Sequence, residues 1–150
     1  MSANKSRPHV IVLPEDRKNL ELANGFQLQI DWNRQRQMKV LPSAGGWMDV
    51  LAQFQSDQVS YMRRYPSRFM VLLIDFDDDP DRLQYVRAQI PDDLRERVFI
   101  VGVLTEPEDL RGDFGTPERA GAALAEDCRQ DTDGNWMHRL LIHNSDEVAR

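Results

Sequence analysis

The sequence predicts an α/β protein, a three-layer sandwich with a mostly parallel central sheet of about four strands. Short apolar runs rich in β-branched residues alternate along the chain with segments whose apolar residues recur at helical spacing. Continuous apolar runs are typical of parallel strands that are covered on both faces. Right-handed crossovers between such strands place helices on either side of one sheet.

The first strand is predicted at His9–Leu13 (HVIVL), which ends at Pro14. Good helix formers follow from Glu15 to Ala23, and the pair Asn24-Gly25 is a plausible end for that helix. Residues 26–30 (FQLQI) alternate apolar and polar side chains, which predicts an edge strand or an insertion.

A second buried strand is predicted at Met38–Leu41, followed by a turn, residues 42–46, whose glycines permit a sharp change of direction. The clearest helix then begins near Trp47 and ends before Pro66. Its predicted inner face holds Trp47, Val50, Leu51, Phe54, Tyr61 and Met62. Phe69–Ile74 (FMVLLI) is the most apolar run and predicts a central strand.

A further helix is expected over Asp81–Ile90, and Val98–Leu104 is the fourth buried strand. A helix near Pro117–Cys128 would place Cys128 on an inward face as a buried thiol. We interpret residues 1–150 as one domain, with a core of about 8–104 and a helical C-terminal extension over 105–150.

Composition narrows the classes of function. The net charge of −6 argues against a protein that holds nucleic acid by electrostatics alone, so any such binding would need metal ions or a partner. No apolar run is long enough for a membrane helix, and the polar start, Met1–Pro8, does not indicate export. With Cys128 as the single cysteine, we expect a cytoplasmic protein without internal disulfides.

Acidic side chains follow two of the predicted strands. Glu15 comes after the first strand, and Asp75 and Asp77 come after the third. Ligands of parallel sheets lie beyond the carboxyl ends of the strands, and carboxylates there suit Mg²⁺, which prefers oxygen ligands. Glu15 would join the pair if the first and third strands are neighbours. The alternative is a solvated acidic turn in which one aspartate caps the next helix.

These acidic positions carry a resemblance to a known family. Glu15 after the first strand, the Ser43–Gly46 turn after the second and Asp75-Phe76-Asp77 after the third resemble the Toprim domain of topoisomerases, primases and OLD-type nucleases. The resemblance covers roughly residues 8–104. It departs from the family in one respect, because no glycine lies close after Glu15.

The resemblance implies a metal-dependent nuclease-like domain that acts on nucleic-acid phosphodiesters. Glu15, Asp75 and Asp77 would then be catalytic and would bind Mg²⁺ or Mn²⁺, with Asp79 or Glu108 as ligands of a second ion. The domain would belong to a larger assembly, with an ATPase as partner by analogy with OLD-type systems. Hydrolysis by an activated water is the simpler expectation, because no tyrosine can be assigned as a nucleophile.

Two other classes remain open. An atypical receiver-like signalling domain would use the Glu15/Asp16 pair, a phosphorylated Asp75 and Thr105, although a lysine after a fifth strand is lacking. A non-catalytic interaction subunit of the same fold would use its surface instead, with Trp32, Trp136 and Met137 as interface residues.

Positive charge is concentrated in two clusters that could contact phosphates of a nucleic acid. Solvated faces that offset nearby carboxylates are the alternative interpretation. The tentative nucleic-acid-binding residues are Arg34, Arg36, Lys39, Arg63 and Arg64.

Overall fold

The computed structural model describes residues 7–30, 37–76, 79–102 and 114–130. Strands and helices alternate along the chain, as the apolar runs predicted. In order they are β1 (His9–Pro14), α1 (Arg17–Leu28), β2 (Met38–Val40), α2 (Trp47–Gln53), a π-helical turn η2 (Phe54–Gln58), α3 (Val59–Arg64), β3 (Arg68–Leu73), α4 (Pro80–Ala88), a 3-10 helix η3 (Asp92–Arg97), β4 (Val98–Val101) and α6 (Pro117–Gln130).

The strands form one sheet in the order β2-β1-β3-β4, and every pairing in it is parallel. The α/β prediction with about four strands is therefore confirmed. β1 and β3 are the two central strands, and their register pairs His9 with Arg68 at one end and Pro14 with Leu73 at the other. The carboxyl ends of β1 and β3 consequently meet at the same edge of the sheet.

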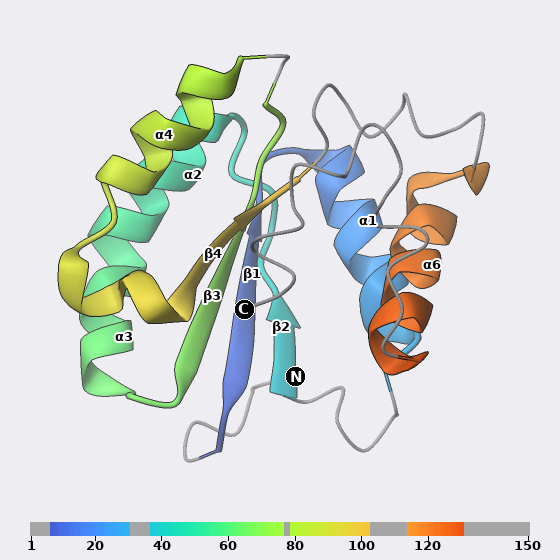
Figure 1. Cartoon of the computed structure of the whole chain (residues 1–150), viewed down its shortest axis with the longest axis horizontal. Helices are drawn as coiled ribbons and strands as arrows, with labels where there is room; N and C mark the ends of the chain where they lie inside the picture. The colour runs from blue at the N-terminus through green and yellow to red at the C-terminus, as the bar shows by residue number, and fades with distance from the viewer. Residues whose placement is uncertain (1–6, 31–36, 77–78, 103–113, 131–150) are drawn as a thin grey trace.

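Helices cover both faces of the sheet, which makes three layers (Figure 1). One core lies under α2, α3 and α4, where Leu13, Phe54 and Met70 are among its fully buried members. The other core lies under α1 and α6, where Val12 and Leu73 pack against Leu22 and Leu124. Neighbouring residues of one strand thus point into opposite cores, which explains why the strands are apolar at nearly every position.

The expected end of the first helix at Asn24-Gly25 is wrong, because α1 continues to Leu28. Gly25 serves the packing of α1 against α6. A Cβ built on Gly25 would lie 2.0 Å from the Glu118 carbonyl oxygen, and one built on Gly121 would lie 1.9 Å from the Leu22 carbonyl oxygen. Each helix therefore carries a glycine where the other helix's backbone approaches it.

The strand or insertion predicted over residues 26–30 is also wrong. Phe26 and Ile30 both pack into the core under α1 and α6, whereas Leu28 between them is 71% exposed. The contacting residues are four apart, which is helical spacing, and Phe26 to Leu28 form the end of α1. The strand-like alternation arose because a helix end carries an exposed leucine, Leu28, between two residues that pack into the core.

The helix after the glycine turn contains a π-helical turn that the sequence did not predict. Phe54, Gln58 and Met62 follow one another at intervals of four and are all buried. Tyr61, which was expected on the inner face, is 43% exposed. The wider turn changes the angular position of later residues, because its hydrogen bonds span five residues instead of four.

The C-terminal part of the described chain belongs to the fold. Ala120 and Leu124 of α6 are buried in the same core as Val12 of β1. Cys128 on α6 is exposed, so the expected buried thiol is wrong. Over the described ranges, no helix has the length and apolar character needed to cross a membrane. The expectations for Trp32, Thr105, Trp136 and Met137 concern positions outside the described residues.

Candidate functional site

Glu15 and Asp75 lie together where the two central strands end. Glu15 N–H donates to the Leu73 carbonyl at 2.9 Å, which extends the β1–β3 pairing by one residue. Its side chain then turns toward β3, and Glu15 Oε2 accepts a hydrogen bond of 2.6 Å from Asp75 N–H. The predicted condition, that the first and third strands are neighbours, is met, and residues 60 positions apart come into contact.

The glycine turn before α2 holds the backbone of Glu15. Gly45 N–H donates to the Glu15 carbonyl at 2.8 Å, and Ala44 N–H donates to the Pro14 carbonyl at 3.0 Å. Gly45 has a backbone φ of 111°, a left-handed conformation that residues with a side chain rarely adopt. The glycine at position 45 therefore lets the chain turn directly against the end of β1.

The environment of Glu15 disfavours its charged form. Burial raises the pKa of the Glu15 carboxyl above its usual 4.5, and the neighbouring charge of Asp16 raises it further. Hydrogen bonds from the backbone N–H groups of Asp75 and Trp47 lower the pKa, as does the positive charge of Arg82, but burial has the largest effect. Additional positive charge at this position would stabilise the carboxylate.

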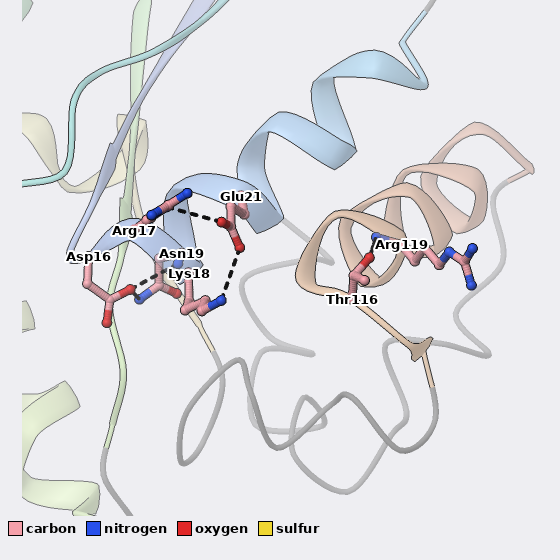
Figure 2. Close-up of polar contacts among 7 residues, drawn as sticks. All are labelled: Asp16, Arg17, Lys18, Asn19, Glu21, Thr116 and Arg119. Atoms are coloured by element: carbon pink, nitrogen blue, oxygen red, sulfur yellow. Dashed lines mark hydrogen bonds and ion pairs between the residues drawn. The ribbon is translucent and has the colours of Figure 1, made fainter.

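Asn19 connects Asp16 to Asp75. Asp16 caps α1, because its Oδ1 accepts a hydrogen bond of 3.0 Å from Asn19 N–H. The Asn19 side chain is fully buried, and its Nδ2 donates at 3.1 Å both to Asp16 Oδ1 and to Asp75 Oδ1. Figure 2 shows Asp16 and Asn19 facing one another at the start of α1. We call Glu15, Asp16, Asn19 and Asp75 the acidic edge.

Arg17 and Lys18, in the first turn of α1, pair with Glu21 of the same helix. Arg17 Nε lies 3.4 Å and Lys18 Nζ 3.6 Å from the carboxylate oxygens of Glu21 (Figure 2). Figure 2 also shows the neighbouring start of α6, where Thr116 Oγ1 accepts a hydrogen bond from Arg119 N–H.

Arg82 of α4 provides positive charge beside the acidic edge. Its Nη1 donates at 2.6 Å to the Asp75 carbonyl, and its guanidinium lies 4.8 Å from the centre of the Trp47 ring. The Trp47 ring in turn meets the Tyr85 ring edge-on, with 5.8 Å between centroids. Arg82 therefore bridges the end of β3 and the start of α2.

The other predicted acidic residues have different fates. Asp79 is exposed and caps α4, where its Oδ1 accepts a hydrogen bond of 3.0 Å from Asp81 N–H. One aspartate of the acidic turn is thus a helix cap, as the alternative interpretation proposed. Asp77 and Glu108 lie outside the described residues. Within the described ranges, no three acidic, histidine or cysteine side chains form a group able to hold a metal ion.

The described members of the proposed nucleic-acid-binding set, Lys39, Arg63 and Arg64, lie away from the acidic edge. Arg63 and Arg64 end α3 and precede β3, so they lie toward the opposite end of the strands (Figure 1). Arg63 pairs with Asp93, with Nε and Oδ2 3.1 Å apart, and Arg64 lies over the Tyr65 ring. Lys39 is exposed on β2. Arg34 and Arg36 lie outside the described residues.

A second buried polar cluster lies at the amino end of the central strands. Arg68 donates from Nε to His9 Nε2 at 3.2 Å and from Nη1 to Gln58 Oε1 at 3.1 Å. Its guanidinium also lies 5.4 Å from the ring centres of Tyr61 and Tyr65. We call His9, Gln58 and Arg68 the amino-end network.

Sequence reasoning missed Asn19 and Arg82. Asn19 follows the cap Asp16 by three residues, the spacing at which a helix N-terminus folds back on its cap, so a local signal existed. Arg82 carried no comparable signal, because its contacts to Asp75 and Trp47 depend on how α4 packs on α2.

Comparison with protein-family models gives no match for this chain, and comparison with curated proteins gives no significant match either.

Proposed function

We propose that the acidic edge binds a divalent cation, Mg²⁺ or Mn²⁺, and that the chain is a Toprim-like nuclease acting on nucleic-acid phosphodiesters within a larger assembly. The observation that carries the proposal is the 2.6 Å hydrogen bond from Asp75 N–H to Glu15 Oε2. It joins two of the three residues that the Toprim resemblance assigns to the metal, through the Glu15 carboxylate and the Asp75 backbone. Asp77, the third, follows Asp75 by two residues in the chain.

The side chains at the acidic edge suit a hard cation. Carboxylate and amide oxygens are the ligands that Mg²⁺ prefers, and the ion commonly takes one or two carboxylates and completes its shell with water and substrate phosphates. When bound, such an ion polarises a phosphate and lowers the pKa of a bound water. Its charge would also offset the burial and the Asp16 charge that raise the pKa of Glu15.

The residues of the chain have two proposed roles, holding the ion and attracting the phosphate. Glu15 and Asp75, with Asp77, would hold the ion, and Asp79 would reach a second ion only by giving up its role as cap of α4. Arg82 places positive charge next to Asp75, where a phosphate approaching the ion would meet it.

Binding of nucleic acid needs further positive charge, because a net charge of −6 repels a polyanion. We extend the proposal to a protein partner of the ATPase class. On this chain, five basic side chains would contact the nucleic-acid phosphates alongside that partner: Arg34, Arg36, Lys39, Arg63 and Arg64.

The test combines metal binding with cleavage. A cation that binds only the folded state raises the melting midpoint, so millimolar Mn²⁺ or Mg²⁺ should raise the Tm of the wild type. The Asp75→Asn variant should lose that rise. Metal-dependent cleavage of single- and double-stranded DNA and RNA should be lost in Asp75→Asn and Glu15→Gln, by about 100-fold or more.

Asp93→Asn is the matched control, because Asp93 is an exposed carboxylate paired with Arg63 at the other end of the strands. It should keep both the metal-induced rise in Tm and cleavage. A wild type whose Tm does not respond to either metal would contradict the proposal and favour the non-catalytic interaction subunit.

A receiver-like signalling domain is the second candidate, and the strand order favours it. The order β2-β1-β3-β4 agrees with the first four strands of the flavodoxin-like arrangement that receiver domains use. In that case Asp75 would be phosphorylated. Incubation with acetyl phosphate and Mg²⁺, followed by intact-mass measurement, should then add one phosphoryl group to the wild type and none to Asp75→Asn.

A further inference from the structure

Asn19 occupies an unusual position between two carboxylates. It lies in the first turn of α1, it is fully buried, and its Nδ2 donates to Asp16 Oδ1 and Asp75 Oδ1 at 3.1 Å each. Its own Oδ1 is buried and lacks a hydrogen-bond partner among the described residues. Buried amide oxygens normally have partners, because leaving one without a partner costs free energy.

We propose that Asn19 is a positioning residue that holds Asp16 and Asp75 side by side before any cation binds. Asp75 is buried and Asp16 half-buried, and two neighbouring carboxylates repel one another; a neutral amide that donates to both reduces that repulsion without neutralising either charge. Its unpartnered Oδ1 would accept a hydrogen bond from a water that enters with the ion. The metal role of this inference rests on the proposed function, whereas the bridge itself does not.

The orientation of the amide follows from its neighbours. Both contacts of Nδ2 are carboxylate oxygens, which accept hydrogen bonds and cannot donate them when ionised. The reverse orientation would place Oδ1 against two negative oxygens. The bridge therefore requires a side chain of this length that carries two donor hydrogens at its end.

Several charged groups surround the bridge. On the side of β1 and α1 these are Asp16 itself and Glu15, while Lys18 is engaged by Glu21. On the side of β3 and α4, Glu15 accepts from Asp75 N–H and Arg82 donates to the Asp75 carbonyl. The net surroundings are acidic, so an added carboxylate at position 19 would be disfavoured.

The test is the Asn19→Asp variant, which keeps the shape but replaces the two donors by a carboxylate. At neutral pH we expect its Tm to fall by about 5–10 °C, because three carboxylates would then be in contact. Acidification toward pH 5 should raise the Tm of this variant relative to wild type. A carboxyl whose folded-state pKa is raised by like charges binds more protons when folded, so stability increases as pH falls.

Asn24→Asp is the matched control, because Asn24 is exposed on the same helix. The same chemical change there should leave the Tm and its pH trend close to wild type. Equal behaviour of Asn19→Asp and Asn24→Asp in both respects would overturn the inference.

A reciprocal exchange covers the case in which Asn19→Asp does not fold. In the double variant Asn19→Asp/Asp75→Asn, the amide at position 75 can donate to the carboxylate at position 19, so one half of the bridge is restored. This double variant should melt at a higher temperature than Asn19→Asp alone. Failure of both proteins to fold, or equal midpoints for the two, would contradict a bridge between these positions.

A third measurement separates this inference from the proposed function. Millimolar Mn²⁺ should raise the Tm of Asn19→Asp more than that of wild type, because the cation offsets the added carboxylate. A Tm of Asn19→Asp that rises relative to wild type on acidification, without any response of either protein to Mn²⁺, would support the bridge and contradict the metal site. A Mn²⁺-induced rise in Tm that is equal in both proteins, with the same dependence of Tm on pH in both, would contradict the bridge and leave the metal site supported.

Discussion

At the amino end of β1 and β3 a buried arginine donates to an imidazole nitrogen and an amide oxygen, whereas at the carboxyl end of the same strands three acidic residues, Glu15, Asp16 and Asp75, are joined by hydrogen bonds from a backbone N–H and from one asparagine amide. Arg68 contacts an imidazole nitrogen, an amide oxygen and two tyrosine rings. His9 completes that set, since its Nδ1 lies 2.8 Å from the Arg7 carbonyl and donates to it, leaving Nε2 to accept from Arg68.

The acidic edge has the opposite character. Burial raises the pKa of Glu15, Asp16 adds a like charge, and one buried oxygen of Asn19 has no partner among the described residues. Polar groups in a folded protein are normally satisfied, and departures concentrate where a ligand acts. The difference between the two ends is consistent with a structural role for the amino-end network and supports the ligand-binding role proposed for the acidic edge.

The largest expected loss of stability comes from removing Arg68. The Arg68→Ala variant should lower the free energy of unfolding by about 2–4 kcal/mol, because His9 Nε2 and Gln58 Oε1 would be buried without donors. Urea denaturation of Arg68→Ala beside Arg64→Ala measures the effect, since Arg64 is exposed and lies over only one ring. Similar losses of unfolding free energy in Arg68→Ala and Arg64→Ala would contradict a structural role for the amino-end network.

A smaller effect of the opposite sign is expected at the acidic edge. The Glu15→Gln variant, without metal, should be as stable as wild type at pH 7 or more stable by up to about 1 kcal/mol, because the amide oxygen can still accept from Asp75 N–H. The raised pKa fixes the pH dependence. Between its unfolded and its raised folded-state pKa, the Glu15 carboxyl binds more protons in the folded protein than in the unfolded chain, so its contribution to stability is lost as pH rises through the folded-state pKa.

The check for Glu15 is the difference in unfolding free energy between Glu15→Gln and wild type, measured from pH 4 to pH 7. The advantage of Glu15→Gln should grow as the pH increases. An advantage that shrinks with increasing pH would mean that the folded state favours the charged carboxylate, and the contrast between the two ends would then be weaker.

The smallest effect is expected for the exposed pair at the end of α3. Arg63 and Asp93 are both exposed, and exposed ion pairs contribute little to stability. Arg63→Ala should leave urea denaturation almost unchanged and should not alter any response to metal. A loss comparable to that of Arg68→Ala would show that the amino-end network extends to the surface.

The fold was largely predictable because the strands are buried on both faces. Runs such as Phe69–Ile74 leave no exposed position, so their apolar character alone indicated a covered parallel sheet. The contact between Glu15 and Asp75 could be predicted only on the condition that β1 and β3 are neighbours. The strand order of the structure meets that condition.

The errors arose where a distant segment decides the local structure. Gly25 resembles a helix end, and only the approach of the Glu118 backbone explains a glycine inside α1. Asp77 and the tentative residues Arg34 and Arg36 lie outside the described part of the chain, so their roles stay predictions. Asn19 was missed because its place three residues after Asp16 indicates only a helix cap, and its second carboxylate partner, Asp75, is 56 positions away in the sequence.

The π-helical turn between α2 and α3 makes this part of the chain tolerant of a one-residue deletion. The turn contains one residue more than an α-helical turn would, and Phe54, Gln58 and Met62 in and after it are buried. Gln55, Ser56 and Asp57 are exposed, and removing one of them would leave the buried residues at i, i+3 and i+7. That is the spacing of one face of an α-helix, so the chain can shorten by one residue here and keep the same side chains in the core.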